Sequence, residues 1–272
     1  MLQGPRSTSM VAFLLGSDRV RDFSQEGEDM SLAKTTAATT TTMSPTTPSV
    51  LSMEEICERY KQLYAGAVYD VLESLGYPNQ AISHQLTPLA PGMKLAGPAF
   101  TFKGTFTAER DEDGRRKRLK MVCNMTSPCI EVRDQGTPYN LAIYGELSAT
   151  TARAHGAVGA LIDGGTRDCA HLIAMKFPVF ARYRSPVEAF GRYTIVACQV
   201  PVRIAGELTE TIIVNPGDFI FGEEDGALVI PKDLMVQVLL ECERIKGLEN
   251  QARSDFARGD DPLEVFQRYK RF

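Results

Sequence analysis

The sequence predicts an α/β fold with a core of parallel strands joined by short helices and a long helix near the C-terminal end. The first observation is that, from residue 140 onward, short apolar runs alternate with helix-like segments. Strands that are bridged by helices in this way run parallel, with right-handed crossovers. The second observation is the amphipathic stretch 233–257, which has the length and spacing of a closing helix.

The composition fits a protein with an ordinary hydrophobic core and excludes several classes. Of the 272 residues, 43% are hydrophobic and 24% are charged, so a core can form without disulfides or a structural metal. A formal net charge of −4 argues against nucleic-acid binding. No apolar run approaches the ~18 residues of a membrane span. The six cysteines are scattered without a CxxC pair, which indicates reduced thiols in the cytoplasm and no structural zinc.

The first fifty residues differ from the rest of the chain. The stretch TTAATTTTMSPTTPS at 35–49 has almost no large apolar residue, so we expect residues 1–50 to form a disordered arm. A single folded domain is then expected over 51–272. The short apolar run at 10–15 is followed by acidic residues, unlike a secretory or transit signal. A mis-assigned start, with Met30 or Met53 as the true first residue, is favoured over targeting.

Two helices and a strand are expected at the beginning of the folded part. Ser52 and Glu55 form a capping box ahead of an apolar-periodic run, which indicates the start of a helix. A second helix is expected over 67–75, because a glycine that commonly ends helices follows it. The alternating stretch 92–103 predicts a strand, and its Gly97-Pro98 pair indicates a bulge or an edge position.

A highly charged segment follows, with ten charged residues among the twelve of ERDEDGRRKRLK at 109–120. It allows two interpretations. One is a loop that binds phosphate or a partner, and the other is a solvated hairpin tip whose acidic half faces its basic half. We favour the hairpin tip, since charge runs without aromatic residues are usually exposed surfaces.

The strand–helix alternation then begins. Strands are expected over 140–144, 158–162 and 178–181, with a turn at 163–166 and helices over 146–155 and 168–175. Further strands are expected over 193–205, 207–214 and 227–230, ahead of the closing helix.

Two of the predicted strand ends carry residues that could bind a ligand or take part in a reaction. In an open α/β sheet, ligands bind beyond the carboxyl ends of parallel strands. The first end delivers Gly145-Glu146-Leu147-Ser148, a helix N-terminus whose free N–H groups can hold a carboxylate or phosphate. The second delivers Arg167 and Asp168 on a tight turn.

These residues suit the chemistry of 2-oxo acids. An aspartate with few other protein ligands suits Mg²⁺, which keeps several waters. The planar guanidinium of Arg167 suits a substrate carboxylate or a developing enolate oxygen. A metal and an arginine at a helix N-terminus would stabilise a pyruvate enolate, which indicates retro-aldol cleavage or β-keto-acid decarboxylation. A structural alternative remains open, in which Asp168 only satisfies the helix dipole and Arg167 is a surface residue.

The motifs together resemble the RraA-like family. They are GEL at 145–147, GAVG at 156–159, DGGTRD at 163–168 and PGD–GEEDGALVIP over 216–231, in this order. The family includes class II pyruvate aldolases that act on 4-hydroxy-4-methyl-2-oxoglutarate, oxaloacetate decarboxylases and regulators of ribonuclease E activity. The resemblance implies a layered β/β/α fold of the swivelling-domain type and assembly as homotrimers or homohexamers.

The resemblance also implies roles for single residues. Arg167 and the Gly145–Ser148 amides would bind the 2-oxo acid substrate, and Asp168 would ligate Mg²⁺ or Mn²⁺. Glu146 would orient the catalytic water or proton, so that Arg167 and Glu146 are the catalytic candidates. The enzyme is favoured over the regulator because the chain keeps Asp168, whereas regulators lack an aspartate after the arginine.

Departures from the family pattern leave the substrate open. The aldolases commonly read GDLL where this chain reads GELS at 145–148. The charged segment at 109–120 and the stretch after it replace a shorter family segment that leads into the site. The alternatives are a non-catalytic protein-binding regulator of ribonuclease activity and a related lyase that acts on a sugar-derived 2-oxo acid.

Overall fold

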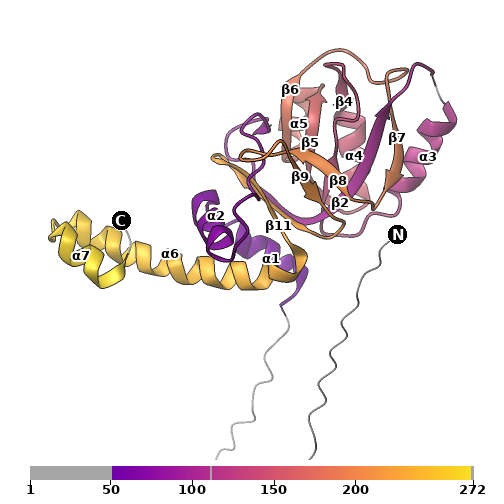
Figure 1. Cartoon of the computed structure of the whole chain (residues 1–272). Coiled ribbons are helices and arrows are strands. Elements are labelled where there is room, and N and C mark those ends of the chain that lie inside the picture. The colour runs from indigo at the N-terminus through magenta and orange to yellow at the C-terminus, as the bar shows by residue number, and fades with distance from the viewer. Residues whose placement is uncertain (1–50, 111, 271–272) are drawn as a thin grey trace, which may run out of the picture. The chain divides into compact units, whose positions relative to one another are not determined.

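A nine-stranded sheet organises the residues described by the computed structural model, which are 51–110 and 112–270 (Figure 1). The strands lie in the order β1-β6-β5-β3-β2-β10-β11, while β4 pairs with β5 and β7 pairs with β2. Two further strands, β8 and β9, pair only with each other. The predicted arm at residues 1–50 lies outside the described residues.

The strands are β1 (Thr87–Pro88), β2 (Leu95–Phe106), β3 (Cys129–Arg133), β4 (Ala142–Tyr144), β5 (Ala157–Thr166), β6 (Val179–Arg184), β7 (Tyr193–Cys198), β8 (Val202–Ala205), β9 (Thr211–Val214), β10 (Phe219–Glu223) and β11 (Gly226–Ile230). The helices are α1 (Met53–Tyr60), α2 (Ala65–Ser74), α3 (Glu112–Val122), α4 (Glu146–Ala154), α5 (Cys169–Ala174), the 3₁₀ helix η1 (Lys232–Leu234), α6 (Met235–Ala257) and α7 (Pro262–Tyr269).

The predicted parallel core is confirmed. Strand β5 pairs in parallel with β3, β4 and β6, and β3 pairs in parallel with β2. The remaining pairs of the large sheet are antiparallel and extend it at both ends. The register that matters for the site sets Tyr144 beside Thr166, so the chain leaves β4 and β5 at the same edge.

Two apolar clusters hold the sheet and helices together. The larger one includes the buried side chains of the parallel strands together with residues of α4 and α5. The second joins α1, α2 and α6 to β10 and β11, which Figure 1 shows running beside these helices. In it the Tyr60 ring lies 4.4 Å from that of Phe219. Burial of this apolar surface fixes the helices against the sheet.

Several local predictions agree with the structure. The Ser52 hydroxyl accepts a hydrogen bond from the Glu55 N–H at 3.1 Å, which is one half of the predicted capping box. The helix expected over 67–75 is present as α2, and the closing helix is present as α6. Among the described residues, no helix combines the length and apolar character that a membrane crossing requires.

Other local predictions were wrong. The strand expected over 92–103 is present as β2, which pairs on both sides of the sheet. The bulge expected at Gly97-Pro98 is not there, because these residues pair with β10 in regular register, and the register shift lies at Lys103/Gly104. Residues 163–166 continue strand β5 and do not form a turn. The segment 193–205 is two strands, β7 and β8, which belong to different sheets. Strand β10 and helix α7 were not predicted.

The charged segment at 109–120 is also not a hairpin tip. From Glu112 to Val122 it forms helix α3, with acidic residues in its first turn and a lysine in its last. This arrangement of charges suits the helix dipole. Helix α3 packs against β7 and thereby reaches the edge where β4 and β5 end.

Candidate functional site

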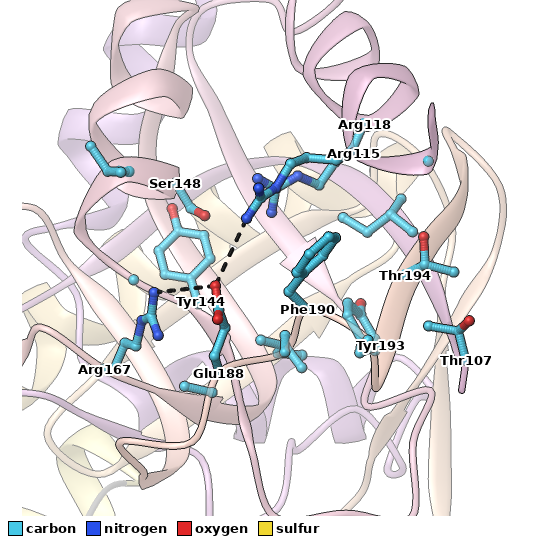
Figure 2. A pocket seen from close by; sticks show the side chains of 18 of the residues that line it. Thr107, Arg115, Arg118, Tyr144, Ser148, Arg167, Glu188, Phe190, Tyr193 and Thr194 are labelled. Atoms are coloured by element: carbon cyan, nitrogen blue, oxygen red, sulfur yellow. Dashed lines mark ion pairs between the residues drawn. The ribbon is translucent and has the colours of Figure 1, made fainter. Parts of the chain in front are cut away.

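A cavity of about 180 Å³ opens at the carboxyl ends of β4 and β5 (Figure 2). Segments far apart in the sequence form it: the turns after both strands, helix α3, and the loop that leads into β7. The residues that line it are Thr107, Glu109, Gly114, Arg115, Arg118, Ala142, Ile143, Tyr144, Gly145, Leu147, Ser148, Arg167, Asp168, Glu188, Ala189, Phe190, Gly191, Tyr193, Thr194 and Ile195.

Gly145 and Asp168 meet at one end of this cavity. Gly145 precedes the first turn of α4, and Asp168 adopts the left-handed conformation, with φ of 56°, ahead of α5. The Glu146 N–H donates to Asp168 Oδ2 at 3.2 Å. Asparagine and aspartate tolerate this backbone conformation better than most residues. The turn after β5 therefore directs a carboxylate at the N-terminus of α4.

Arg167 links this end of the cavity to the opposite wall. Its Nε lies 3.7 Å from Asp168 Oδ2, and its Nη2 lies 3.9 Å from Glu188 Oε1. The same Glu188 oxygen lies 3.8 Å from Arg115 Nη2 on α3. Figure 2 shows the Glu188 carboxylate between the two guanidinium groups. The cavity is lined by three arginines and three carboxylates, so opposite charges are balanced within it.

The structure brings most of the predicted site residues together. Gly145, Leu147, Ser148, Arg167 and Asp168 all line the cavity. Leu147 is 78% exposed, and its N–H is one of the first-turn groups that have no acceptor within a helix.

Glu146 is placed differently from the other predicted residues. It is absent from the cavity lining, and its Oε1 accepts a hydrogen bond from the Thr150 hydroxyl at 2.7 Å, one helical turn further along. Glu146 therefore contributes to the site through its backbone N–H, which donates a hydrogen bond to Asp168.

Sequence reasoning missed the residues of the opposite wall. These are Arg115 and Arg118 of α3, and Glu188 and Phe190 of the loop before β7. The charged run at 109–120 carried a signal for the arginines, since a phosphate- or partner-binding segment was the alternative interpretation. Glu188 had no sequence signal, because only the folded chain places it beside Arg167.

A buried ionic network supports the wall of the cavity from behind. Arg133 of β3 pairs with Glu131 at 2.6 Å, and the side chains of both residues are at most 1% exposed. Arg133 also donates to the Ile143 carbonyl at 2.6 Å and lies 4.7 Å above the Tyr144 ring. The Tyr144 hydroxyl donates to Glu131 at 3.1 Å, and burial together with Glu131 raises the pKa of Tyr144. This network fixes strand β4 just ahead of Gly145.

Arg118 stands out among the cavity cations. It is half-buried, and no hydrogen bond or ion pair involving its side chain is present among the described residues. Burial and the nearby positive charge of Arg133 lower the pKa of Arg118 to about 10, and the negative charge of Glu131 opposes part of this effect. A half-buried cation without a direct ion-pair partner is unfavourable, so this position favours the arrival of an anion.

The donor atoms at Asp168 fit a hard divalent cation that keeps most of its water. Asp168 Oδ2 accepts the Glu146 N–H, and Oδ1 has no hydrogen-bond or ion-pair partner within the described part of the chain. In that part no three histidine, cysteine, aspartate or glutamate side chains form a group that could hold a metal. One carboxylate with water and substrate oxygens is an arrangement common for Mg²⁺ and unlike a structural zinc site.

Gly145→Ala tests the close approach of the two turns. A Cβ at this position would lie 2.7 Å from Asp168 Oδ2 and 3.2 Å from Arg167 Cγ. Since φ is −173°, the backbone itself accepts any residue, so the new Cβ would act only by displacing the side chains of Asp168 and Arg167. We expect any activity that uses these two side chains to fall about tenfold or more, with the free energy of unfolding changed by at most about 1 kcal/mol.

The matched control is Gly247→Ala within α6, where no atom lies within 4 Å of the new Cβ. It should leave that activity unchanged and stabilise the protein by about 0.5–1 kcal/mol. Steady-state kinetics and urea unfolding measure both quantities. Full activity of Gly145→Ala would show that the contact between the turns is dispensable.

Comparison with known proteins identifies the family. The model of the family described as RraA-like: Aldolase/RraA matches residues 65–229, more than half of the chain. The chain belongs to the RraA-like family. The resemblance drawn from the motifs at 145–168 and 216–231 is thereby confirmed, and the matched segment contains every residue that lines the cavity.

Two curated relatives of this RraA-like chain illustrate the range of the family. Protein DlpA of Legionella pneumophila is 25% identical over 76% of the chain, and the chain spans about a third (32%) of that protein's length. A Halalkalibacterium halodurans protein provisionally named 4-hydroxy-4-methyl-2-oxoglutarate aldolase is 26% identical, and the match covers 72% of the chain and 85% of that protein.

Solved structures share the RraA-like fold. One, described among novel cellulases from microbes associated with the gut ecosystem, is 31% identical with a TM-score of 0.69, over 76% of this chain and 90% of that one. Streptomyces coelicolor RraAS2, described as an unusual member of the RNase ES inhibitor RraA protein family, is 19% identical with a TM-score of 0.63, over 74% and 97% of the two chains. The predicted RraA-like α/β fold is thereby confirmed.

Proposed function

We propose that this protein is a divalent-metal-dependent lyase that releases pyruvate from a 4-hydroxy-2-oxo diacid of the 4-hydroxy-4-methyl-2-oxoglutarate type, and that it decarboxylates oxaloacetate. The observation that carries the proposal is the position of Arg167 and Asp168 beside the N-terminus of α4, within one cavity. The aldolase name of a relative that is 26% identical supports the same reaction class.

The pyruvate part of the substrate would bind at the N-terminus of α4. The first-turn N–H groups of Leu147 and Ser148 have no acceptor within the helix and can donate to a carboxylate. The Arg167 guanidinium can donate to the same carboxylate and to the 2-oxo oxygen. The helix fixes the amides before the substrate arrives, so they need little reorganisation.

The reaction breaks the bond between C3 and C4 of the substrate. The 4-hydroxyl loses its proton to water and its oxygen forms a carbonyl at C4, which releases a second oxo acid. The C3–C4 electron pair moves toward the 2-oxo group, and the resulting pyruvate enolate takes up a proton at C3. Arg167 and the α4 amides stabilise the negative charge that develops on the enolate oxygen. Asp168 would hold a Mg²⁺ or Mn²⁺ ion, which supplies Lewis-acid polarisation of the 2-oxo group when bound.

The test is pyruvate release from oxaloacetate and from 4-hydroxy-4-methyl-2-oxoglutarate in a coupled assay. The protein is first treated with EDTA and then supplied with Mg²⁺ or Mn²⁺. We expect chelation to abolish release and either metal to restore it well above the background of the metal alone. The same preparation should have the mass of a trimer or hexamer by light scattering.

Absence of pyruvate from both compounds, with folded protein and added metal, would contradict the proposal. The remaining candidates would then be a lyase for a sugar-derived 2-oxo acid and a non-catalytic regulator of ribonuclease activity. A panel of 2-oxo acids and an endoribonuclease inhibition assay would distinguish these two.

A further inference from the structure

We propose that Arg115 and Arg118 of helix α3 form a second anion-binding subsite, which recognises the distal carboxylate of a dicarboxylic 2-oxo acid. The inference deepens the proposed function and rests on it, since it assigns the other end of the same substrate. It concerns the wall of the cavity that faces the α4 N-terminus across Glu188.

The geometry of Glu188 indicates where a second carboxylate can sit. One oxygen of Glu188 lies 3.8 Å from Arg115 Nη2 and 3.9 Å from Arg167 Nη2. These separations are longer than those of close charge-assisted hydrogen bonds, so the chain's own carboxylate only partly satisfies the two guanidinium groups. The space between α3 and Arg167 therefore already accepts a carboxylate.

Arg115 is held in place by an aromatic neighbour. Its guanidinium carbon lies 4.4 Å from the centre of the Phe190 ring, within the range of a cation–π contact. Glu112, one turn earlier on α3, lies 3.7 Å from Arg115 Nη1. A side chain supported in this way loses little further freedom when it binds a ligand.

Arg118 supplies a positive charge that makes no direct ion pair within the described residues. Its side chain points from α3 into the same cavity as that of Arg115 (Figure 2). It is half-buried and has no ion pair among the described residues, in contrast to Arg115 and Arg167. A ligand carboxylate that reached Arg118 would gain a charge-assisted hydrogen bond without having to break an existing ion pair.

The two ends of the cavity then match the two ends of a diacid. The α4 amides and Arg167 face one carboxylate, while Arg115 and Arg118 face the other. A monocarboxylic 2-oxo acid of the same chain length would leave Arg118 half-buried without an anion. The α3 wall therefore selects for a second negative charge, and not only for length.

Binding of two ligands that the proposed reaction does not cleave tests this subsite. 2-Oxoglutarate and 2-oxopentanoate have the same number of carbons, but only 2-oxoglutarate has the distal carboxylate. By calorimetry in excess Mg²⁺, the wild-type protein should bind 2-oxoglutarate about tenfold more tightly or better. Arg118→Met and Arg115→Met should each remove most of this preference and leave the affinity for 2-oxopentanoate within about threefold.

The matched control is Arg116→Met, which removes the same charge from an exposed position on the same helix outside the cavity lining. It should keep the wild-type preference. Circular dichroism verifies folding, and Arg118→Met leaves no buried counter-charge behind because Arg118 has no ion pair among the described residues.

Equal affinities of the wild-type protein for the two ligands, or no measurable binding of 2-oxoglutarate, would overturn the inference. So would an unchanged preference in both α3 variants. The binding readout does not require turnover, so it separates the two proposals. A preference for 2-oxoglutarate that the α3 variants lose, without pyruvate release, would support the subsite and contradict the lyase. Pyruvate release, with a preference that both α3 variants keep, would support the lyase and contradict the subsite.

Discussion

Asp168→Asn is expected to lower metal-dependent pyruvate release by about a hundredfold or more. Asparagine keeps the size of the side chain, tolerates the left-handed backbone at φ of 56° and can still accept the Glu146 N–H. It removes the negative charge that a divalent cation requires. Steady-state kinetics over a metal titration measures the effect, and Asp168→Ala should lose at least as much activity.

The control for this prediction is Asp70→Asn, an exposed aspartate on α2 far from the cavity lining. It removes the same charge and should leave the kinetics unchanged. Wild-type turnover of Asp168→Asn after chelation and metal titration would contradict the role of this carboxylate, and would favour the structural alternative in which Asp168 only caps a helix.

Glu131→Gln is expected to destabilise the protein by about 3–5 kcal/mol. Glutamine keeps the volume of the side chain and can accept the Tyr144 hydroxyl, but it leaves the Arg133 charge buried without its counter-ion. An isolated charge in the interior costs far more free energy than a surface charge. Urea unfolding followed by circular dichroism gives the free energy of unfolding.

Removing both charges tests whether the lost stability comes from the unpaired arginine. The double variant Glu131→Gln/Arg133→Met should recover much of the lost stability, because no uncompensated charge remains. Glu58→Gln serves as the surface control. Its partner Lys61 lies 2.7 Å away, but the Glu58 side chain is 70% exposed, so this change should cost at most about 1 kcal/mol. A loss from Glu131→Gln no larger than this would contradict the prediction.

Much of one half of the site could be predicted from the sequence. The strand–helix units around 140–175 carry local signals: apolar runs, glycines at 145 and 156, and a helix N-terminus after each strand. Parallel strands place their carboxyl ends at one edge, so Gly145 and Arg167 had to come close together. The structure agrees, because Tyr144 pairs with Thr166 and these residues directly precede Gly145 and Arg167.

The direction of a single side chain did not follow from these signals. Glu146 lies within the predicted motif, yet its carboxylate accepts from Thr150 and does not line the cavity. Which way a first-turn side chain points depends on competing local hydrogen bonds, and sequence spacing alone does not rank them.

The other half of the site depended on long-range contacts. The sequence predicts a solvated hairpin tip for the segment 109–120, because charge runs without aromatic residues are usually exposed surfaces. In the folded chain α3 packs against β7, and β7 pairs with β2, so Arg115 meets Glu188 from a loop about seventy residues away and Arg118 lines the same cavity. The pair Glu131 and Arg133 likewise shares one face of β3, but only burial by neighbouring strands makes it an ionic network.

By itself, the sequence determined the α/β class, the parallel strand–helix core, the family, and the pairing of the α4 N-terminus with Arg167 and Asp168. Each of these follows from periodicity, glycine positions or motif order over short distances. Only the tertiary structure decided that β2 is central, that the charged segment is a helix, and that its arginines face the same cavity. These outcomes depend on the burial of surfaces far apart in the chain, which no local pattern encodes.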